Sequence, residues 1–183
     1  DMKLPLIGDH QLLNAVVALA AIAEIDKTGH PVEETAVKKG IESVKWPCRL
    51  SIVSSEPLIL IDGAHNEDGI NSLYDALVKY FGSRKKIFVI GMLRDKDYGY
   101  AIRKLMPIAY HAVTTEPHNE RALTADAMAE AVRPYCRRVV SEPDIIKAIE
   151  KAEELYEKDS MICICGSLYL AGQAYGYITD TRI

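Results

Sequence analysis

Three polar residues stand together where an apolar stretch of the sequence ends. The run from Pro57 to Gly69 reads PLILIDGAHNEDG, and Asp62, His65 and Asn66 follow its apolar part directly. A strand this apolar is typical of the interior of a sheet, so its carboxyl end can present polar groups to a ligand. Simpler interpretations stay open: Asp62 accepts from backbone N–H groups in its turn, His65 is a loop residue, and Asn66 caps a helix.

Other polar residues follow the later apolar runs in the same way. Asp95, Lys96 and Asp97 come after the second run, and Gly166 and Ser167 come after the last. The third run is followed by a longer polar set, Thr114, Thr115, Glu116, His118, Asn119 and Arg121. Ordinary roles are open here too, because Asp97 suits the first turn of a helix and Gly166–Ser167 suits a tight turn with a cap.

The elements that position these residues alternate between strand and helix. Six apolar runs predict strands near 49–55, 57–63, 86–93, 109–117, 137–140 and 160–166. Helical spacing predicts helices over 66–81, from Tyr98 to Pro107, from a cap at Thr124 to Pro134, over 145–156 and over 167–178. This order predicts an α/β fold with a mostly parallel sheet of about six strands, one of them antiparallel, covered on both faces.

The first part of the chain predicts helices without strands. Apolar spacing favours one long helix that Asp9 caps and Gly29 ends, and a second, shorter helix that ends at Gly40. We therefore expect two parts, a helical segment over 1–44 and an α/β domain over 45–183. Near the end of the chain, Ser141 with Asp144 has the spacing of a capping box before a further helix.

Composition excludes several classes of function. The net charge is −4 and the sequence pI about 5.8, which favours neither nucleic acid nor an anionic membrane as a partner. No apolar run has membrane-spanning length, and no secretory signal is visible, so we expect a cytoplasmic protein. Cys163 and Cys165 share one face of a predicted strand and indicate core packing, and zinc-type cysteine spacing is absent, so no metal site is expected.

Common phosphate-binding and catalytic motifs are missing from the sequence. It has no G-x-x-x-x-G-K-[ST] and no G-x-G-x-x-G, so it carries neither a triphosphate cradle nor a dinucleotide fingerprint. It also lacks the G-x-S-x-G elbow and the H-E-x-x-H zinc motif. From the residues alone, the prediction is an α/β domain with a polar edge.

Four stretches in series resemble one family. They are GDHQLLNA (8–15), WPCR (46–49), DGAHN (62–66) and GSLYLAG (166–172). Together they resemble folylpolyglutamate synthases and the bifunctional dihydrofolate synthases of the Mur ligase superfamily. The resemblance implies a Rossmann-like C-terminal domain of a ligase that uses ATP to add L-glutamate to folate through an acyl phosphate. The P-loop and the Mg²⁺ ligands would then lie in a separate N-terminal ATPase domain, whose last helices are residues 1–44.

The resemblance also implies roles for individual residues. Asn14 matches an asparagine that reaches adenine, and Arg49 matches an arginine that reaches ATP. Asp62 matches an aspartate at the ribose, and His65 a histidine beside the base. The residues expected to help bind substrate are Asn66, Asp95, Lys96 and Ser167. We expect Asn14 to act from the helical segment, and Asp62, at a loop edge, to add little to stability.

The sequence departs from the family pattern at two positions. Cys48 replaces the glycine of W-P-G-R, and it is strained if that position needs a positive φ. Glu67 replaces a proline that often follows D-G-A-H-N. Two alternatives remain at this point: the equivalent domain of a peptidoglycan-precursor ligase, and a non-catalytic α/β binding or signalling module. We expect a monomer, with no catalytic residue of its own and no turnover by the chain alone.

Overall fold

The chain divides into two compact units at Pro47. A computed structural model describes residues 1–181 and separates Asp1–Pro47 from the unit that begins at Cys48. The sequence predicted a boundary three residues earlier, at 44/45. Each unit is described by itself. No helix within residues 1–181 has both the length and the hydrophobicity that a membrane span needs.

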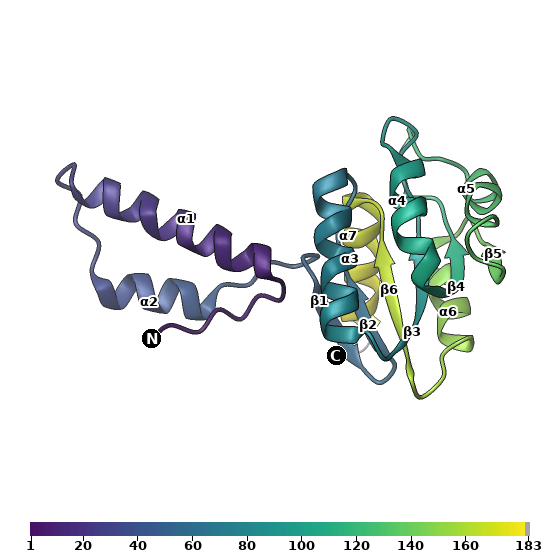
Figure 1. Cartoon of the computed structure of the whole chain (residues 1–183), viewed down its shortest axis with the longest axis horizontal. Helices are drawn as coiled ribbons and strands as arrows, with labels where there is room; N and C mark the ends of the chain where they lie inside the picture. The colour runs from purple at the N-terminus through teal and green to yellow at the C-terminus, as the bar shows by residue number, and fades with distance from the viewer. Residues whose placement is uncertain (182–183) are drawn as a thin grey trace. The chain divides into compact units, whose positions relative to one another are not determined.

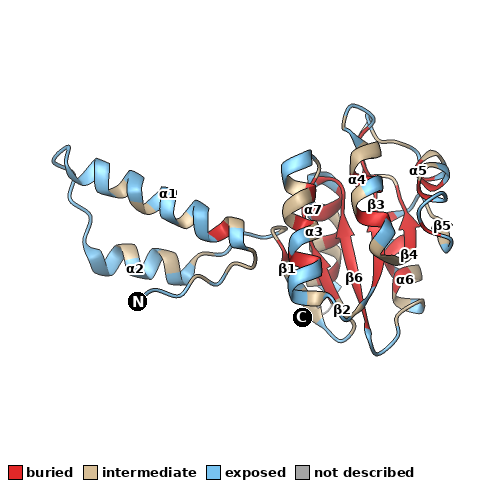
Figure 2. Cartoon of the chain, in the orientation of Figure 1, coloured by how far each residue is buried: buried red, intermediate tan, exposed pale blue. Residues whose placement is uncertain are grey.

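The first unit is the predicted pair of helices, α1 (Asp9–Asp26) and α2 (Glu34–Ser43). The N-cap of α1 is Gly8, at φ +107°, so the prediction that Asp9 caps this helix was wrong; Asp9 is instead its first residue, where a carboxylate interacts favourably with the helix dipole. Gly29, at φ +86°, lies just beyond the last turn of α1. Figure 2 shows that most of α1 is exposed.

The second unit alternates strands and helices as predicted (Figure 1). Its strands are β1 (Ser51–Ser55), β2 (Leu58–Ile61), β3 (Lys85–Ile90), β4 (Ala109–Thr114), β5 (Val139–Ser141) and β6 (Ser160–Cys165). Its helices are α3 (Glu67–Phe81), α4 (Tyr98–Leu105), α5 (Ala125–Val132), α6 (Ile145–Glu154) and α7 (Leu168–Thr181), with a 3₁₀ turn over Met106–Ile108.

The six strands form one sheet in the order β1-β2-β6-β3-β4-β5. β1 pairs with β2 antiparallel, and all the other pairs are parallel. The predicted fold class is therefore confirmed. Because β6 lies between β2 and β3, the last strand of the chain is central, and the segment after it ends beside the segments after β2 and β3.

Helices cover both faces of this sheet in three layers. α6 and α7 pack on one face, where isoleucines of β2, β3 and β6 form the core with Ile149 and Ala174. α3, α4 and α5 cover the other face, and Figure 1 shows α3 and α4 in front of the sheet with α7 behind it. All six residues of β6 are buried, as a central strand between two helical layers requires, and Figure 2 shows the strands as the buried part of this unit.

Polar side chains begin the helices after the strands. Asn66, Asp97 and Thr124 each accept from the backbone N–H three residues on, which confirms the predicted Thr124 cap. The cap of α6 is Asp144, which accepts from Lys147 N, so the prediction of a capping box starting at Ser141 was wrong. Ser141 is the last residue of β5, and its hydroxyl donates to Asp126.

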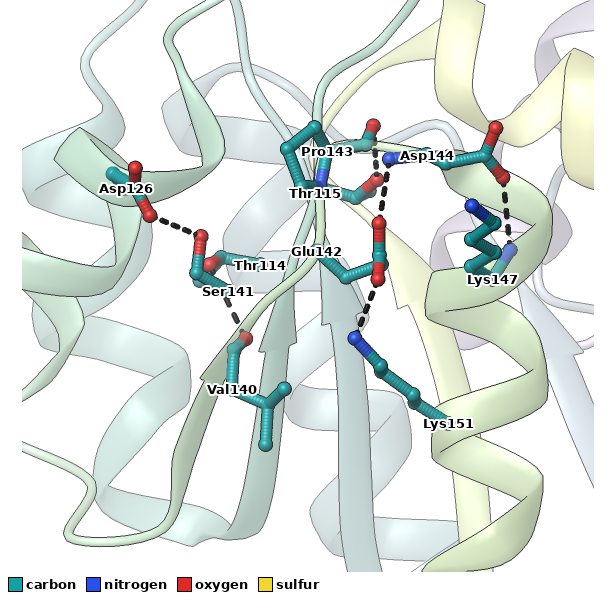
Figure 3. A network of polar contacts seen from close by, with 10 residues as sticks. All are labelled: Thr114, Thr115, Asp126, Val140, Ser141, Glu142, Pro143, Asp144, Lys147 and Lys151. Atoms are coloured by element: carbon teal, nitrogen blue, oxygen red, sulfur yellow. Dashed lines mark hydrogen bonds and ion pairs between the residues drawn. The ribbon is translucent and has the colours of Figure 1, made fainter.

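A network of polar contacts fixes the segment between β5 and α6 (Figure 3). Glu142 pairs with Lys151 and accepts from Asp144 N, and the Lys151 hydrogen bond lowers the pKa of Glu142. The Thr115 hydroxyl donates to Pro143 O over 3.1 Å. These contacts tie the short edge strand to β4 and α6, so they are structural.

Candidate binding site at the carboxyl edge of the sheet

A cavity of about 160 Å³ lies beyond the carboxyl ends of β2, β3 and β6. It is lined by His65, Leu93, Lys96, Arg121, Gly166, Ser167, Leu168 and Tyr169. Three of the predicted site residues, His65, Lys96 and Ser167, therefore come together. The others do not line this cavity.

Backbone contacts bring the strand ends close enough to form it. Gly166 N donates to Ala64 O over 3.1 Å, and Gly91 N donates to Cys165 O over 3.3 Å. Gly166 is at φ +107°, and a Cβ on it would lie 2.8 Å from Gly91 O. A larger residue would push these two segments apart, so the close approach of the strand ends needs glycine at position 166.

Arg121 reaches the cavity from the loop before α5. Its Nη1 lies 2.8 Å from Asp95 Oδ2, and its carbonyl accepts from Arg94 N over 2.8 Å. An antiparallel bridge between Leu93 and Ala122 holds the two loops together. Asp95 therefore contacts the cavity residue Arg121, and partly neutralises one of the two cationic side chains that line the cavity.

His65 and Ser167 are each held by the backbone. His65 Nδ1 lies 2.8 Å from Gly63 O; since a carbonyl only accepts, Nδ1 carries the proton in this contact. Ser167 is 2% exposed and its Oγ accepts from Tyr169 N over 3.1 Å, so the capping interpretation of Gly166–Ser167 is confirmed. Asn66 also caps its helix, as one of the two interpretations predicted.

Asp62 is 6% exposed. Its Oδ1 accepts from Ala64 N over 2.7 Å, which confirms that it organises its own turn, and its Oδ2 accepts from Leu50 N over 2.8 Å. The expectation that Asp62 adds little to stability was wrong in its premise, because the carboxylate is buried and hydrogen-bonded. Contact with a ribose stays a prediction.

The segment that carries Arg49 is strained. Cys48 has φ +62° and Leu50 has φ +45°, and each such residue costs roughly 1–2 kcal/mol when it is not glycine. The family glycine at position 48 thus corresponds to a real conformational requirement. The Cys48 thiol is half-buried, and burial together with the Asp62 carboxylate raises its pKa.

Asn14 belongs to the first unit, as predicted. It lies on α1, and its Nδ2 donates to Gln11 Oε1 over 3.2 Å. Its contact with adenine stays a prediction.

Sequence reasoning missed Leu93, Arg121, Leu168 and Tyr169 as members of the site. Arg121 stood among the polar residues after the third apolar run, but nothing in the spacing showed that its loop bridges to Leu93. Leu168 and Tyr169 are 49% and 46% exposed, and they follow Ser167 directly. Their exposure is a property of the folded chain, so the sequence alone offered no signal for these two residues.

The described residues do not offer a metal centre. Within residues 1–181, no three His, Cys, Asp or Glu side chains gather closely enough to hold an ion. Among these residues, no such group of three protein ligands is available to hold Mg²⁺.

The comparisons with known proteins identify the family. Residues 48–168 match the family model described as Mur ligase, glutamate ligase domain. The folylpolyglutamate synthase of Lacticaseibacillus casei is 34% identical over 174 residues, which cover 93% of this chain and 39% of that protein.

Solved structures agree. A Mycobacterium tuberculosis folylpolyglutamate synthase complexed with ADP and AMPPCP superposes with a TM-score of 0.87 at 33% identity, over 97% of this chain and 42% of that one. Escherichia coli FolC in complex with DHPP and ADP gives a TM-score of 0.85 at 26% identity, over 100% of this chain and 42% of that one. The chain thus spans about two fifths of these three proteins, and it belongs to the Mur ligase family, as a glutamate ligase domain.

Proposed function

We propose that this chain is the C-terminal part of an ATP-dependent ligase that adds L-glutamate to a folate. The observation that carries the proposal is the cationic cavity at the carboxyl edge of the sheet, in a chain whose relatives are folylpolyglutamate synthases. In the proposed reaction, ATP transfers its γ-phosphoryl group to the terminal carboxylate of the folate, which forms an acyl phosphate and releases ADP. The amine of glutamate then attacks the acyl phosphate and releases phosphate.

We assign the cavity to L-glutamate. At about 160 Å³ it is smaller than the pockets that enclose drug-sized ligands, so it suits an amino acid better than a whole nucleotide. Lys96 and Arg121 supply positive charge for carboxylates, and the guanidinium fork of Arg121 suits them in particular. Ser167 adds a hydroxyl, while Asp95 orients Arg121 through their 2.8 Å contact. Asn66 is proposed as a further substrate contact.

We assign the nucleotide to a set of residues that shares only His65 with the lining of the cavity. ATP is proposed to contact Arg49 through its phosphates, Asp62 through its ribose, and His65 and Asn14 through its base. The sequence has no P-loop, so the residues that cradle the phosphates, and those that bind Mg²⁺, would lie outside these 183 residues.

The first unit supports the existence of a further domain. Leu12, Leu13, Val16 and Val17 of α1 are 58–69% exposed, and a helix that is apolar on all sides is normally buried. We propose that residues 1–44 complete an ATPase domain that covers these side chains. The chain alone is then expected not to hydrolyse ATP. Phosphate release above background by the purified chain would contradict this.

The test uses the full-length protein with ATP, L-glutamate and either dihydropteroate or tetrahydrofolate. Glutamate-dependent ADP formation, with a product heavier by one glutamate, is the expected result. Arg121→Ala should raise the KM for glutamate roughly ten- to a hundred-fold, since a charge-assisted contact is lost, with a much smaller change in the KM for ATP. Arg137→Ala, at an exposed position before β5, is the matched control. An equal rise in the KM for glutamate and the KM for ATP would show that Arg121 does not bind glutamate specifically.

A further inference from the structure

Arg49 lies between two residues with left-handed backbone conformations. Cys48 has φ +62° and Leu50 has φ +45°, and neither is a glycine. A backbone of this kind persists only where its surroundings hold it, and such segments are typical of functional sites. The position of the Arg49 side chain therefore depends on what holds its two neighbours.

The loop after β2 holds both neighbours. Gly63 N donates to Cys48 O over 2.8 Å, and Leu50 N donates to Asp62 Oδ2 over 2.8 Å. Leu50 is also anchored by burial, at 2% exposed, and Arg49 N donates to Ser51 Oγ over 3.3 Å. The strained segment is thus fastened on each side of Arg49.

Asp62 is in turn fixed by the central strand. Asp62 N donates to Ile164 O of β6 over 2.9 Å, and its Oδ1 accepts from Ala64 N. A continuous set of hydrogen bonds therefore runs from β6 through Asp62 to Leu50. Rigid support of this kind is what a binding side chain on an irregular segment needs.

We propose that Asp62 is a positioning residue for Arg49: its carboxylate holds the left-handed segment so that the guanidinium meets the anionic part of the nucleotide. This inference rests on the proposed function, because it takes Arg49 as a phosphate contact. The positioning role and the ribose contact predict different outcomes, so an experiment can distinguish them. A positioning Asp62 acts only while Arg49 is present, whereas a ribose contact acts on its own.

The test is a double-mutant cycle in the full-length protein, with the KM for ATP as the readout. Asp62→Asn keeps the shape of the side chain, but it has one acceptor oxygen in place of two, so it cannot accept from both Leu50 N and Ala64 N. It should raise the KM for ATP about tenfold, as expected for one charge-assisted hydrogen bond. In the Arg49→Ala background the same change should have almost no further effect. If the factors by which Asp62→Asn and Arg49→Ala raise the KM for ATP multiply in the double variant, the inference is wrong.

A second arm uses 2′,3′-dideoxy-ATP. If Asp62 positions Arg49, the factor caused by Asp62→Asn is the same for this analogue as for ATP. If Asp62 binds the ribose hydroxyls, the factor disappears with the analogue, and the inference fails.

Ser51→Ala is the substitute variant if Asp62→Asn folds poorly. It removes the side-chain acceptor of Arg49 N and lies on an edge strand. It should raise the KM a few-fold only while Arg49 is present, and an equal rise in both backgrounds counts against the proposal.

A third readout needs no activity. In the 183-residue chain, Asp62→Asn should speed amide hydrogen exchange at Arg49 and Leu50 about tenfold or more beyond any change in the central strand β6, whose amides report the global stability. Unchanged exchange at Leu50 overturns the inference. A wild-type protein that transfers no glutamate, combined with faster exchange in the variant, would instead locate the failure in the proposed function.

Discussion

The backbone N–H of Leu50 donates to Asp62 Oδ2 over 2.8 Å, across twelve residues of sequence. The carboxylate also accepts from Ala64 N, and it is 6% exposed. Removing it leaves buried N–H groups without this acceptor, so Asp62→Ala should lower the free energy of unfolding by roughly 2–4 kcal/mol. Urea unfolding of the 183-residue chain measures this.

Asp75→Ala is the control for that measurement. Asp75 is exposed on α3, and its loss should change stability by less than about 0.5 kcal/mol. Equal stability of the Asp62 and Asp75 variants would show that the buried hydrogen bonds do not stabilise the fold.

The strain at Cys48 predicts an unusual order of stabilities. At an ordinary helix or strand position, a protein with glycine is less stable than the same protein with alanine by roughly 0.5–1 kcal/mol. At φ +62° the order should reverse, and Cys48→Gly should be more stable than Cys48→Ala by about 1 kcal/mol. Comparing these two variants separates the backbone effect from the loss of thiol packing. A less stable glycine variant would contradict the left-handed conformation.

Much of the fold could be predicted because local sequence patterns indicate its strands and helices. The apolar run before Asp62 and the run MICICG in β6 indicate burial on both faces, and helical spacing in α3 and α4 indicates the covering layers. The cap of α6 was misplaced because Ser141 and Asp144 both suit helix starts, and only the end of β5 at Ser141 decides between them.

The site was harder to predict because its contacts are long-range. His65, Lys96 and Ser167 follow strand ends, so sheet topology alone brings them together. The burial of Asp62 depends on Leu50, and the place of Arg121 depends on a bridge between two loops. No local pattern encodes either pairing.

Lys86 is buried although its sequence context suggests exposure, and its burial leads to a prediction about stability. It follows Lys85 and looks like a solvated strand start, yet it is 5% exposed. Its ammonium donates to Phe81 O and Arg84 O, both over 2.8 Å, where α3 ends, and burial lowers its pKa. Lys86→Met should destabilise the chain by roughly 2–3 kcal/mol, because the carbonyls at this helix end lose a charged donor.

Lys158→Met is the matched control, because Lys158 is exposed. Its effect on the urea midpoint should be small. A Lys86 variant as stable as this control would show that solvent replaces the ammonium at no cost.

His111 predicts how stability changes with pH. Burial, followed by the positive charge of Arg138, lowers its pKa, with Lys85 acting in the same direction and Glu157 opposing. The unfolded chain therefore binds the proton first, and the contribution of neutral His111 is complete above about pH 6.5 and lost as pH falls through the folded-state pKa. From pH 7.5 to 5.5 the wild type should lose more stability than His111→Gln. If the stabilities of the wild type and of His111→Gln change in parallel with pH, the pKa of His111 is not lowered in the folded chain.

Asn66 allows capping and substrate binding to be separated. Its Oδ1 accepts from Gly69 N over 3.0 Å, and capping residues lost to alanine cost about 1 kcal/mol. Asn66→Ala should therefore be less stable by that amount, while Asn66→Ser, which can still cap, should stay within a few tenths of wild type. Both variants lack the amide, so a substrate contact by Asn66 predicts the same rise in the KM for glutamate in each. If the serine variant keeps the wild-type KM, Asn66 only caps α3 and leaves the proposed glutamate site to Lys96, Arg121 and Ser167.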